Sequence, residues 1–230
     1  MEIVRYIWGV VDSNSWLVTE NNKGILIDAV DNKQLYDTIK KLDDLTIILT
    51  HSHFDHIIGL NRIRDLRPDA IVISSEKCSK YLGNIYRNMS SSATVFMKFY
   101  EKGKKNNIQI EPFICKPADK VFVKRLSIDW CGHRIKLCAV HGHSDDGLLM
   151  IMDEEKLFSG DTLLHTPTVT RFPTGSIKAF WMDDIKMLRR MKEIKSVYPG
   201  HGNVGLIENM LAINNDAMPR KYRDILEGNG

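Results

Sequence analysis

Apolar residues in the first part of the chain fall into short, β-branched runs separated by turn sequences. Such runs predict strands, and a helix is expected over 32–42, where apolar residues repeat at helical spacing. The predicted strands are 3–8, 15–19, 25–27, 46–49 and 70–74. The sequence Asn21-Asn22-Lys23-Gly24 is typical of a hairpin turn. Helical spacing resumes at Ile57 and stops near Pro68.

The second part of the chain repeats this rhythm of strands followed by helices. Its predicted strands are 121–123, 126–130, 134–140, 147–152, 156–158 and 196–198. Ser176 can cap an amphipathic helix that reaches Ile194, and a polar helical tail is expected over 205–226. Two sets of consecutive strands, each followed by helix, predict an α/β fold of two half-repeats, with sheet packed on sheet and helices outside.

Residues 77–107 interrupt the rhythm with a basic, aromatic segment. Seven basic residues stand against a single acid, Glu101, and seven aromatic or methionine residues lie among them. We expect one or two irregular helices joined at 89–92, forming an insertion or lid in a single domain that spans 1–230. A solvated basic helix explains the composition equally well.

The composition is that of an ordinary soluble globular protein. Hydrophobic residues make up 43% and charged residues 27%. The formal charge of +3 does not indicate nucleic acid, and we expect no membrane as a partner. The four cysteines form no CxxC pair, which favours buried thiols in a reducing compartment. The chain shows no signal peptide and no apolar stretch of about 20 residues, so we expect a cytoplasmic protein. Its oligomeric state is not predicted.

Candidate chemistry is concentrated in the segment Thr50-His51-Ser52-His53-Phe54-Asp55-His56, directly after a predicted strand. Three of the eight histidines lie within six positions, beside a carboxylate. Imidazole and carboxylate together suit zinc, iron or manganese better than calcium or magnesium. Four candidate ligands exceed the three that a catalytic zinc usually takes from protein, which favours two ions.

Three further candidate ligands also follow predicted strands, and each lies next to a glycine. They are His143, Asp161 and His201. Spacing alone leaves His141 open as an alternative to His143. Any one of these positions alone is a weak signal, but their joint occurrence at one end of consecutive strands is a strong one.

The His51-x-His53-x-Asp55-His56 sequence resembles the signature of the metallo-β-lactamase superfamily. Asp28, His143, Asp161 and His201 match its other motifs in the family's order, over about residues 2–204. The resemblance implies a four-layer αβ/βα sandwich. It also implies that His51, His53 and His143 hold one ion, that Asp55, His56 and His201 hold a second, and that Asp161 bridges them. Asp28 would orient a ligand, and His143 is favoured over His141.

The resemblance implies a dinuclear metallohydrolase. Two divalent ions, zinc or alternatively iron or manganese, would generate a metal-bound hydroxide that attacks an activated acyl bond. Asp55 would orient this hydroxide and receive a proton.

Within the superfamily, the sequence most resembles short glyoxalase-II-like thioesterases. The resemblance lies in three segments, 159–164, Arg171 to Ser176 and 198–202. Thr170 replaces the glycine that precedes the arginine in that group, and only 28 residues follow Gly202, too few for its glutathione-binding domain. We therefore expect a thioester or ester of another small anionic molecule. Arg171, Lys102, Lys104 and Lys105 are the candidate substrate residues.

Other functions stay open at this stage. A lactone hydrolase is less favoured because Leu164 stands where that group carries tyrosine. A phosphodiesterase or nuclease is less favoured because the basic segment is short, so nucleic acid is not the expected partner. A mononuclear-iron sulfur dioxygenase uses similar ligands. A metal-binding sensor domain is the non-enzymatic alternative. Such domains have usually lost some of the metal ligands, and none of the motif ligands is missing from this sequence.

Overall fold

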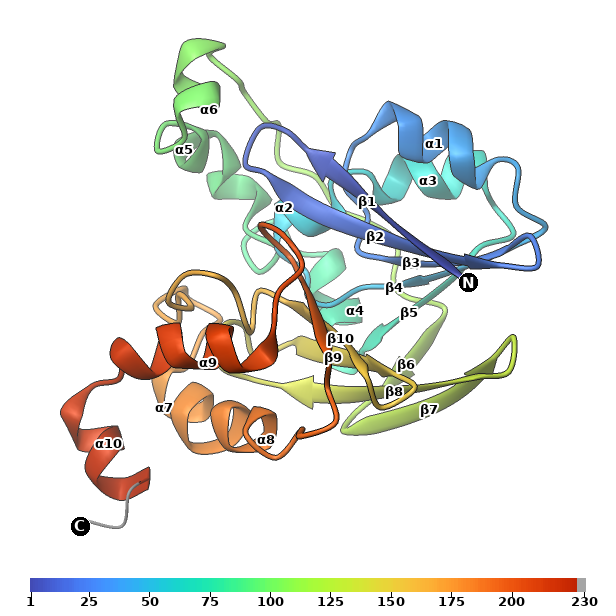
Figure 1. Cartoon of the computed structure of the whole chain (residues 1–230). Coiled ribbons are helices and arrows are strands. Elements are labelled where there is room, and N and C mark those ends of the chain that lie inside the picture. Colours follow the sequence, from blue (N-terminus) through green and yellow to red (C-terminus); the bar gives the residue numbers. More distant parts are fainter. Residues whose placement is uncertain (227–230) are drawn as a thin grey trace. The chain divides into compact units, whose positions relative to one another are not determined.

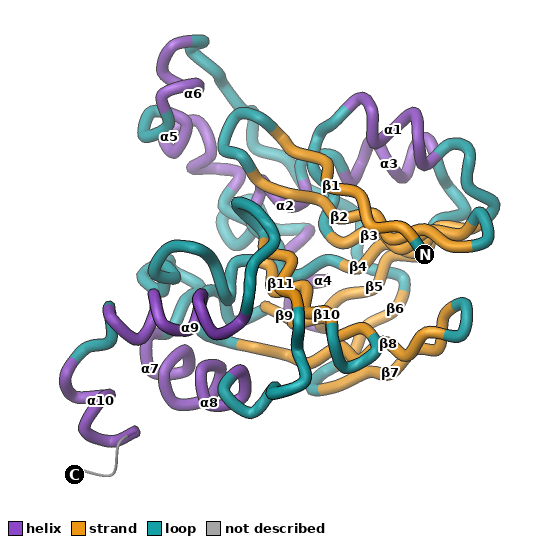
Figure 2. Tube along the Cα trace, in the orientation of Figure 1, coloured by secondary structure: helices purple, strands orange, loops and turns teal. Residues whose placement is uncertain are grey.

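Two β-sheets organise the fold, one in each of two units (Figures 1 and 2). The structure is a computed structural model that describes residues 1–226. The first unit comprises residues 1–124, and the second begins at Arg125. Among the described residues, no helix has the length and apolar character needed to cross a membrane.

The first unit contains a six-stranded sheet in the order β1-β2-β3-β4-β5-β6. Its strands are β1 (Glu2–Trp8), β2 (Ser13–Glu20), β3 (Lys23–Ile27), β4 (Asp44–Ile48), β5 (Ile71–Ser75) and β6 (Lys120–Phe122). Strands β1 to β3 pair antiparallel, and β3 to β6 pair parallel. Asn21 and Asn22 take φ values of 49° and 59° in the β2–β3 turn, as a tight hairpin of this kind requires.

Short helices connect the strands of the first unit. They are α1 (Lys33–Ile39), α2 (Phe54–Ile57), α3 (Leu60–Leu66), α4 (Glu76–Leu82), the 3₁₀ turn η1 (Ser90–Ser92), α5 (Ala93–Met97) and α6 (Glu101–Lys105). The Asn32 side chain caps α1 by accepting a hydrogen bond from the Leu35 N–H at 3.1 Å. Figure 1 shows α1 and α3 beside each other against this sheet.

Two expectations for the first unit need correction. Asp55 and His56 lie on the short helix α2 rather than on a loop, and the apolar helix expected from Ile57 begins at Leu60. The helix is interrupted between α2 and α3 because the His56 carbonyl accepts a hydrogen bond from the Ala29 N–H at 2.7 Å instead of a bond within the helix. The basic segment 77–107 is helical as predicted, but it forms three short α-helices and a 3₁₀ turn.

The second unit contains a five-stranded sheet in the order β11-β10-β9-β8-β7. Its strands are β7 (Arg125–Trp130), β8 (His133–Val140), β9 (Gly147–Met152), β10 (Lys156–Gly160) and β11 (Ser196–Pro199). Strands β7 to β10 pair antiparallel, and β11 pairs parallel with β10. The helices are α7 (Ile177–Ala179), the π-helical turn η2 (Phe180–Asp184), α8 (Ile185–Leu188), α9 (Ile207–Asp216) and α10 (Arg220–Leu226).

One apolar core joins the sheet and helices of the second unit. Residues such as Leu149 and Leu157 on the strands pack with Phe180 and Trp181 on the helices. As predicted, Ser176 caps the first helix by accepting from the Ala179 N–H. That helix ends at Leu188 rather than near Ile194, although Ile194 still joins the core.

The helical tail is divided in two. Helix α9 ends at Asp216 and α10 begins at Arg220, because Pro219 has no N–H to continue the hydrogen-bond ladder. The cysteine prediction is confirmed for Cys78 and Cys115, which are buried, but Cys131 and Cys138 are only half-buried.

Candidate metal centre

The histidine-rich segment leaves the carboxyl end of β4, where parallel strands place functional residues in α/β sheets. His51 and His53 are buried, and their ligand atoms lie within 4.8 Å of each other. A ligand atom of His56 also lies within 4.8 Å of one of His51. The Asp55 Oδ2 atom is 3.5 Å from the His56 Nε2 atom. The four side chains therefore form one cluster within the first unit.

Asp28 lies behind this cluster and is almost fully buried. Its carboxylate accepts hydrogen bonds from the Thr50 N–H and the Thr50 hydroxyl, both at 2.7 Å, and its Oδ2 atom lies 2.9 Å from the His56 Nδ1 atom. The Asp28 backbone takes a φ of 61°, an uncommon conformation for a residue other than glycine. Ser15 fixes the loop through hydrogen bonds to the Asp28 carbonyl and from the Val30 N–H. The carboxylate is thus held where it can orient His56.

These contacts assign the tautomers of His51 and His56. The Asp28 carboxylate can only accept, so the His56 Nδ1 atom carries the hydrogen. The Thr50 hydroxyl uses its hydrogen toward Asp28, so its oxygen accepts from the His51 Nδ1 atom at 3.1 Å. In each neutral ring the lone pair is then on Nε2, the atom suited to bind a metal.

The second unit holds its own cluster, made by His143, Asp161 and His201. The Asp161 Oδ2 atom lies 3.6 Å from the His143 Nε2 atom and 3.4 Å from the His201 Nε2 atom. The Val169 carbonyl lies 2.8 Å from the His143 Nδ1 atom and can only accept, so the lone pair of His143 is also on Nε2. His141 is exposed and directs its Nδ1 atom to the Asp145 carbonyl instead. The structure therefore places His143 in the cluster.

Asp184 supports the chain beside His143. It is buried at the end of η2, and its two oxygens accept from the His141 N–H at 3.2 Å and the Gly142 N–H at 2.7 Å. Burial raises the pKa of Asp184 to about 6, and the two N–H donors act in the opposite direction. A side chain at position 142 would come within 2.6 Å of Phe180, so only glycine fits this approach.

The donor set fits divalent metal ions. Ring nitrogens and carboxylate oxygens are the ligands of zinc, iron and manganese sites. Ligand atoms bound at about 2.1 Å in a tetrahedron lie about 3.4 Å from one another. The three nitrogen–oxygen separations given above, 3.4 to 3.6 Å, have this size.

The candidate substrate residues lie outside these clusters. Lys102 is exposed on α6 and forms an ion pair with Asp12 at 2.9 Å. Lys104 and Lys105 are exposed on the same helix. Arg171 is exposed and lines a cavity of about 320 Å³ in the second unit, together with Val169 and Trp181.

Thr50, Val169 and Asp184 are supporting residues that sequence reasoning did not assign. Val169 acts through its carbonyl, for which no sequence signal exists. Asp184 did carry a signal, because it is an acid within the apolar stripe formed by Phe180, Trp181 and Ile185.

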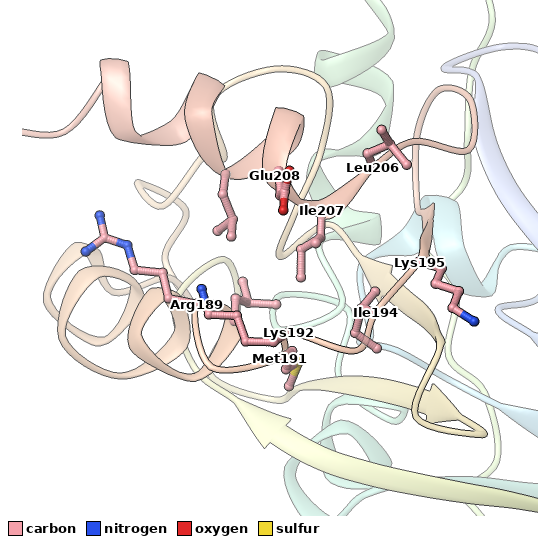
Figure 3. Close-up of a pocket in the computed structure, with 10 residues that line it drawn as sticks. Arg189, Met191, Lys192, Ile194, Lys195, Leu206, Ile207 and Glu208 are labelled. Carbon is pink, nitrogen blue, oxygen red and sulfur yellow. The ribbon is translucent and has the colours of Figure 1, made fainter.

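A separate pocket of about 330 Å³, with a mixed apolar and charged lining, lies between the end of α8 and the start of α9 (Figure 3). Its apolar wall includes Met191, Ile194 and Ile207. Of its basic residues, Lys195 pairs with Glu155 and Arg189 bonds to Asn215. No candidate ligand lines it.

Comparison with known proteins gives the family. Residues 8–201 match the family model described as "Metallo-beta-lactamase superfamily". The chain belongs to this superfamily. A probable metallo-hydrolase of Streptococcus pyogenes serotype M6 is 27% identical over 207 residues, which cover 88% of this chain and 84% of the relative. A hydroxyacylglutathione hydrolase of Glaesserella parasuis is 21% identical, over 94% of this chain and 78% of the relative.

Among solved structures, the superfamily fold is matched by the crystal structure of the B3 metallo-beta-lactamase BLEG-1. It has a TM-score of 0.76 and 23% identity, and the match covers 95% of this chain and all of that chain. The predicted fold class is therefore confirmed. The protein is a hydrolase of the metallo-beta-lactamase superfamily, and each of its units carries a histidine–aspartate cluster able to bind a divalent metal.

Proposed function

We propose that this protein is a dinuclear metallohydrolase that cleaves the thioester or ester of a small anionic molecule. The observation that carries the proposal is that the full set of ligand-type side chains is present, with three histidines oriented by hydrogen bonds through Nδ1. The similarity to a hydroxyacylglutathione hydrolase supports an acyl thioester as the substrate class.

In this proposal the two clusters together hold two ions. His51, His53 and His143 would hold the first ion, Asp55, His56 and His201 would hold the second, and Asp161 would contribute to both. Zinc is the proposed metal, and iron and manganese are the alternatives that this donor set accepts. When bound, such ions lower the pKa of a coordinated water and stabilise negative charge that develops on oxygen.

The side chains of the protein orient the reactants and move protons. Thioester hydrolysis forms a bond from the water oxygen to the acyl carbon and breaks the carbon–sulfur bond. The water loses a proton, and the thiolate that leaves gains one. Asp55 is the proposed acceptor of the first proton, because its carboxylate is partly exposed beside His56. Asp28 keeps the His56 ring in place during this step.

The basic residues outside the clusters support an anionic substrate. Lys104 and Lys105 are exposed on α6, where their field can attract a negatively charged molecule. The double variant Lys104→Gln/Lys105→Gln should lower kcat/KM for an anionic thioester at low salt, and high salt should remove the difference. Equal kcat/KM values for both proteins at low salt would contradict this role.

A substrate panel tests the proposed reaction. Zinc-loaded protein is assayed with short acyl thioesters, a lactone and a phosphodiester, and oxygen uptake is followed separately. We expect turnover of thioesters without oxygen uptake and a loss of about 10²- to 10⁴-fold in kcat for Asp55→Asn. Glu101→Gln removes a carboxylate outside the clusters and should leave kcat unchanged. Faster turnover of the lactone or phosphodiester, or wild-type activity in Asp55→Asn, would refute the proposal.

A further inference from the structure

Helix α5 and the turn that joins it to α6 expose large apolar side chains to solvent. Val95 is 56% exposed, Phe99 74% and Tyr100 42%. Phe99 and Tyr100 lie on the turn between the two helices, directly after Lys98. Figure 1 shows α5 and α6 standing apart from the sheet of the first unit. We call residues 93–105 the α5–α6 corner.

The α5–α6 corner is fixed on its inner side. Phe96 stacks on Phe54 with ring centroids 6.3 Å apart, and Phe54 meets Trp8 edge to face at the same distance. Gly103 is buried, and a side chain there would come within 2.2 Å of the Met97 carbonyl oxygen, so the two helices are in close contact. These contacts hold the corner in place, so Phe99 and Tyr100 are exposed while the protein is folded.

The corner is strongly basic. It carries four lysines, Lys98, Lys102, Lys104 and Lys105, against one acid, Glu101. Lys102 pairs with Asp12. In the part of the chain that the structure describes, the other three ammonium groups form no ion pair. Three exposed cationic side chains thus lie within six residues of Phe99 in the sequence.

We propose that the α5–α6 corner docks the protein onto an anionic lipid surface. Aromatic rings and lysines side by side match the two layers of a membrane interface, where rings enter the headgroup region and ammonium groups contact lipid phosphates. The net charge of the whole chain does not reveal this feature, because the positive charge is local. The exposure of the rings is known only from the structure.

Charge alone would also suit an acidic protein or a small anion. The exposed Val95 and Phe99 argue against a small anion, which apolar side chains would not bind. Aromatic rings also occur at protein interfaces, but lysine is depleted there, so rings together with three lysines favour a lipid surface. The corner stands apart from the sheet (Figure 1), whereas small-molecule sites are concave, so Lys104 and Lys105 can attract a soluble anion by their field without forming its binding site. The proposal concerns binding and does not depend on the proposed hydrolysis.

Vesicle flotation of the full chain tests the proposal. Vesicles of neutral phosphatidylcholine are compared with vesicles that contain about 30% anionic phosphatidylglycerol. One variant removes charge, Lys98→Gln/Lys104→Gln/Lys105→Gln, and another removes the rings, Phe99→Ser/Tyr100→Ser. The matched controls are Lys23→Gln/Lys33→Gln/Lys41→Gln, which removes the same charge from other exposed positions in the first unit, and the exposed Val123→Ser.

We expect the wild type to bind the anionic vesicles and to bind the neutral ones at least about 10-fold more weakly. Each corner variant should weaken binding to anionic vesicles about 10-fold or more, while the controls bind like the wild type. Absence of vesicle binding at low salt, or equal losses in the corner and control variants, would overturn the proposal. So would binding that depends on the lysines but not on the rings, since an acidic partner would then explain the surface.

Discussion

The Asp28 carboxylate holds two neighbours at the first cluster in place, the Thr50 backbone and the His56 ring. It accepts two hydrogen bonds from Thr50 and orients His56, while its own backbone takes a positive φ. Residues held in uncommon conformations persist where the surroundings fix them, and they are frequent at functional sites. The strain and the hydrogen bonds therefore indicate the same role for Asp28.

Asp28→Asn tests that role. The amide group of asparagine cannot accept with its nitrogen, so either Thr50 or His56 loses its partner. We expect metal affinity to fall about 10- to 100-fold, as measured by competition with a chromogenic chelator. Asp153→Asn is the matched control, because Asp153 also accepts from a histidine and a backbone N–H, from His133 and Arg134, away from the ligands. Equal affinities for wild type and Asp28→Asn would contradict the assignment.

Asp184 makes the stability of the protein depend on pH. Its carboxyl group has a usual pKa of 3.8, and burial raises the pKa to about 6 in the folded protein. The folded protein therefore binds this proton more tightly than the unfolded chain. The resulting contribution to the free energy of unfolding is fully present below about pH 4 and is lost as the pH rises through about 6.

Urea unfolding of the metal-free wild type and Asp184→Asn between pH 4 and 8 measures this contribution. The wild type should lose up to about 2–3 kcal/mol relative to the variant as the pH rises across that range. Asp183→Asn, at the exposed neighbouring position, should follow the wild type. Parallel pH curves for the wild type and Asp184→Asn would show that the Asp184 carboxyl titrates normally.

At the residue scale, the ligand-type side chains could be predicted because strand ends and glycine neighbours mark them in the sequence. His143 could be separated from His141 only by resemblance, and the structure gives the physical reason. His143 turns inward and bonds to the Val169 carbonyl, whereas His141 is exposed. Contacts through backbone atoms, such as that of Val169, leave no trace in residue identity.

At the scale of elements, α5 is linked to the ligand segment through an aromatic contact. Phe54 lies between His53 and Asp55 in the sequence and is buried between Trp8 and Phe96. Any displacement of α5 would therefore reach the backbone that carries two candidate ligands.

Phe96→Ala tests how firmly this contact holds α5. Removing the half-buried ring should lower the free energy of unfolding by about 1–3 kcal/mol, measured by chemical denaturation. Phe99→Ala, three residues later and exposed, should change it by no more than about 0.5 kcal/mol. Similar losses in both variants would mean that the Phe96–Phe54 contact does not stabilise the fold.

Strands were easier to predict than helix boundaries. The run Leu45 to Ile48 is apolar on both faces, as a central parallel strand must be, and it forms β4. Helix ends depend on hydrogen bonds that the apolar pattern does not contain. The bond from the Ala29 N–H to the His56 carbonyl separates α2 from α3, and Pro219 separates α9 from α10.

At the scale of the whole molecule, the two half-repeats predicted from the sequence correspond to two units, each with one sheet and one histidine–aspartate cluster. The superfamily match extends over both units. The prediction of a single domain with a lid at 77–107 stays a prediction. The central proposal is that both clusters take part in one dinuclear centre.

Metal stoichiometry tests this proposal most directly. The wild type, His53→Ala, Asp161→Ala and His201→Ala are reconstituted with zinc, freed of excess metal and measured by inductively coupled plasma mass spectrometry, with circular dichroism to confirm folding. We expect two ions per wild-type chain and about one or fewer in each folded variant, including His53→Ala from the first unit and His201→Ala from the second. One ion or none in the wild type, or two ions in all the variants, would contradict the dinuclear centre.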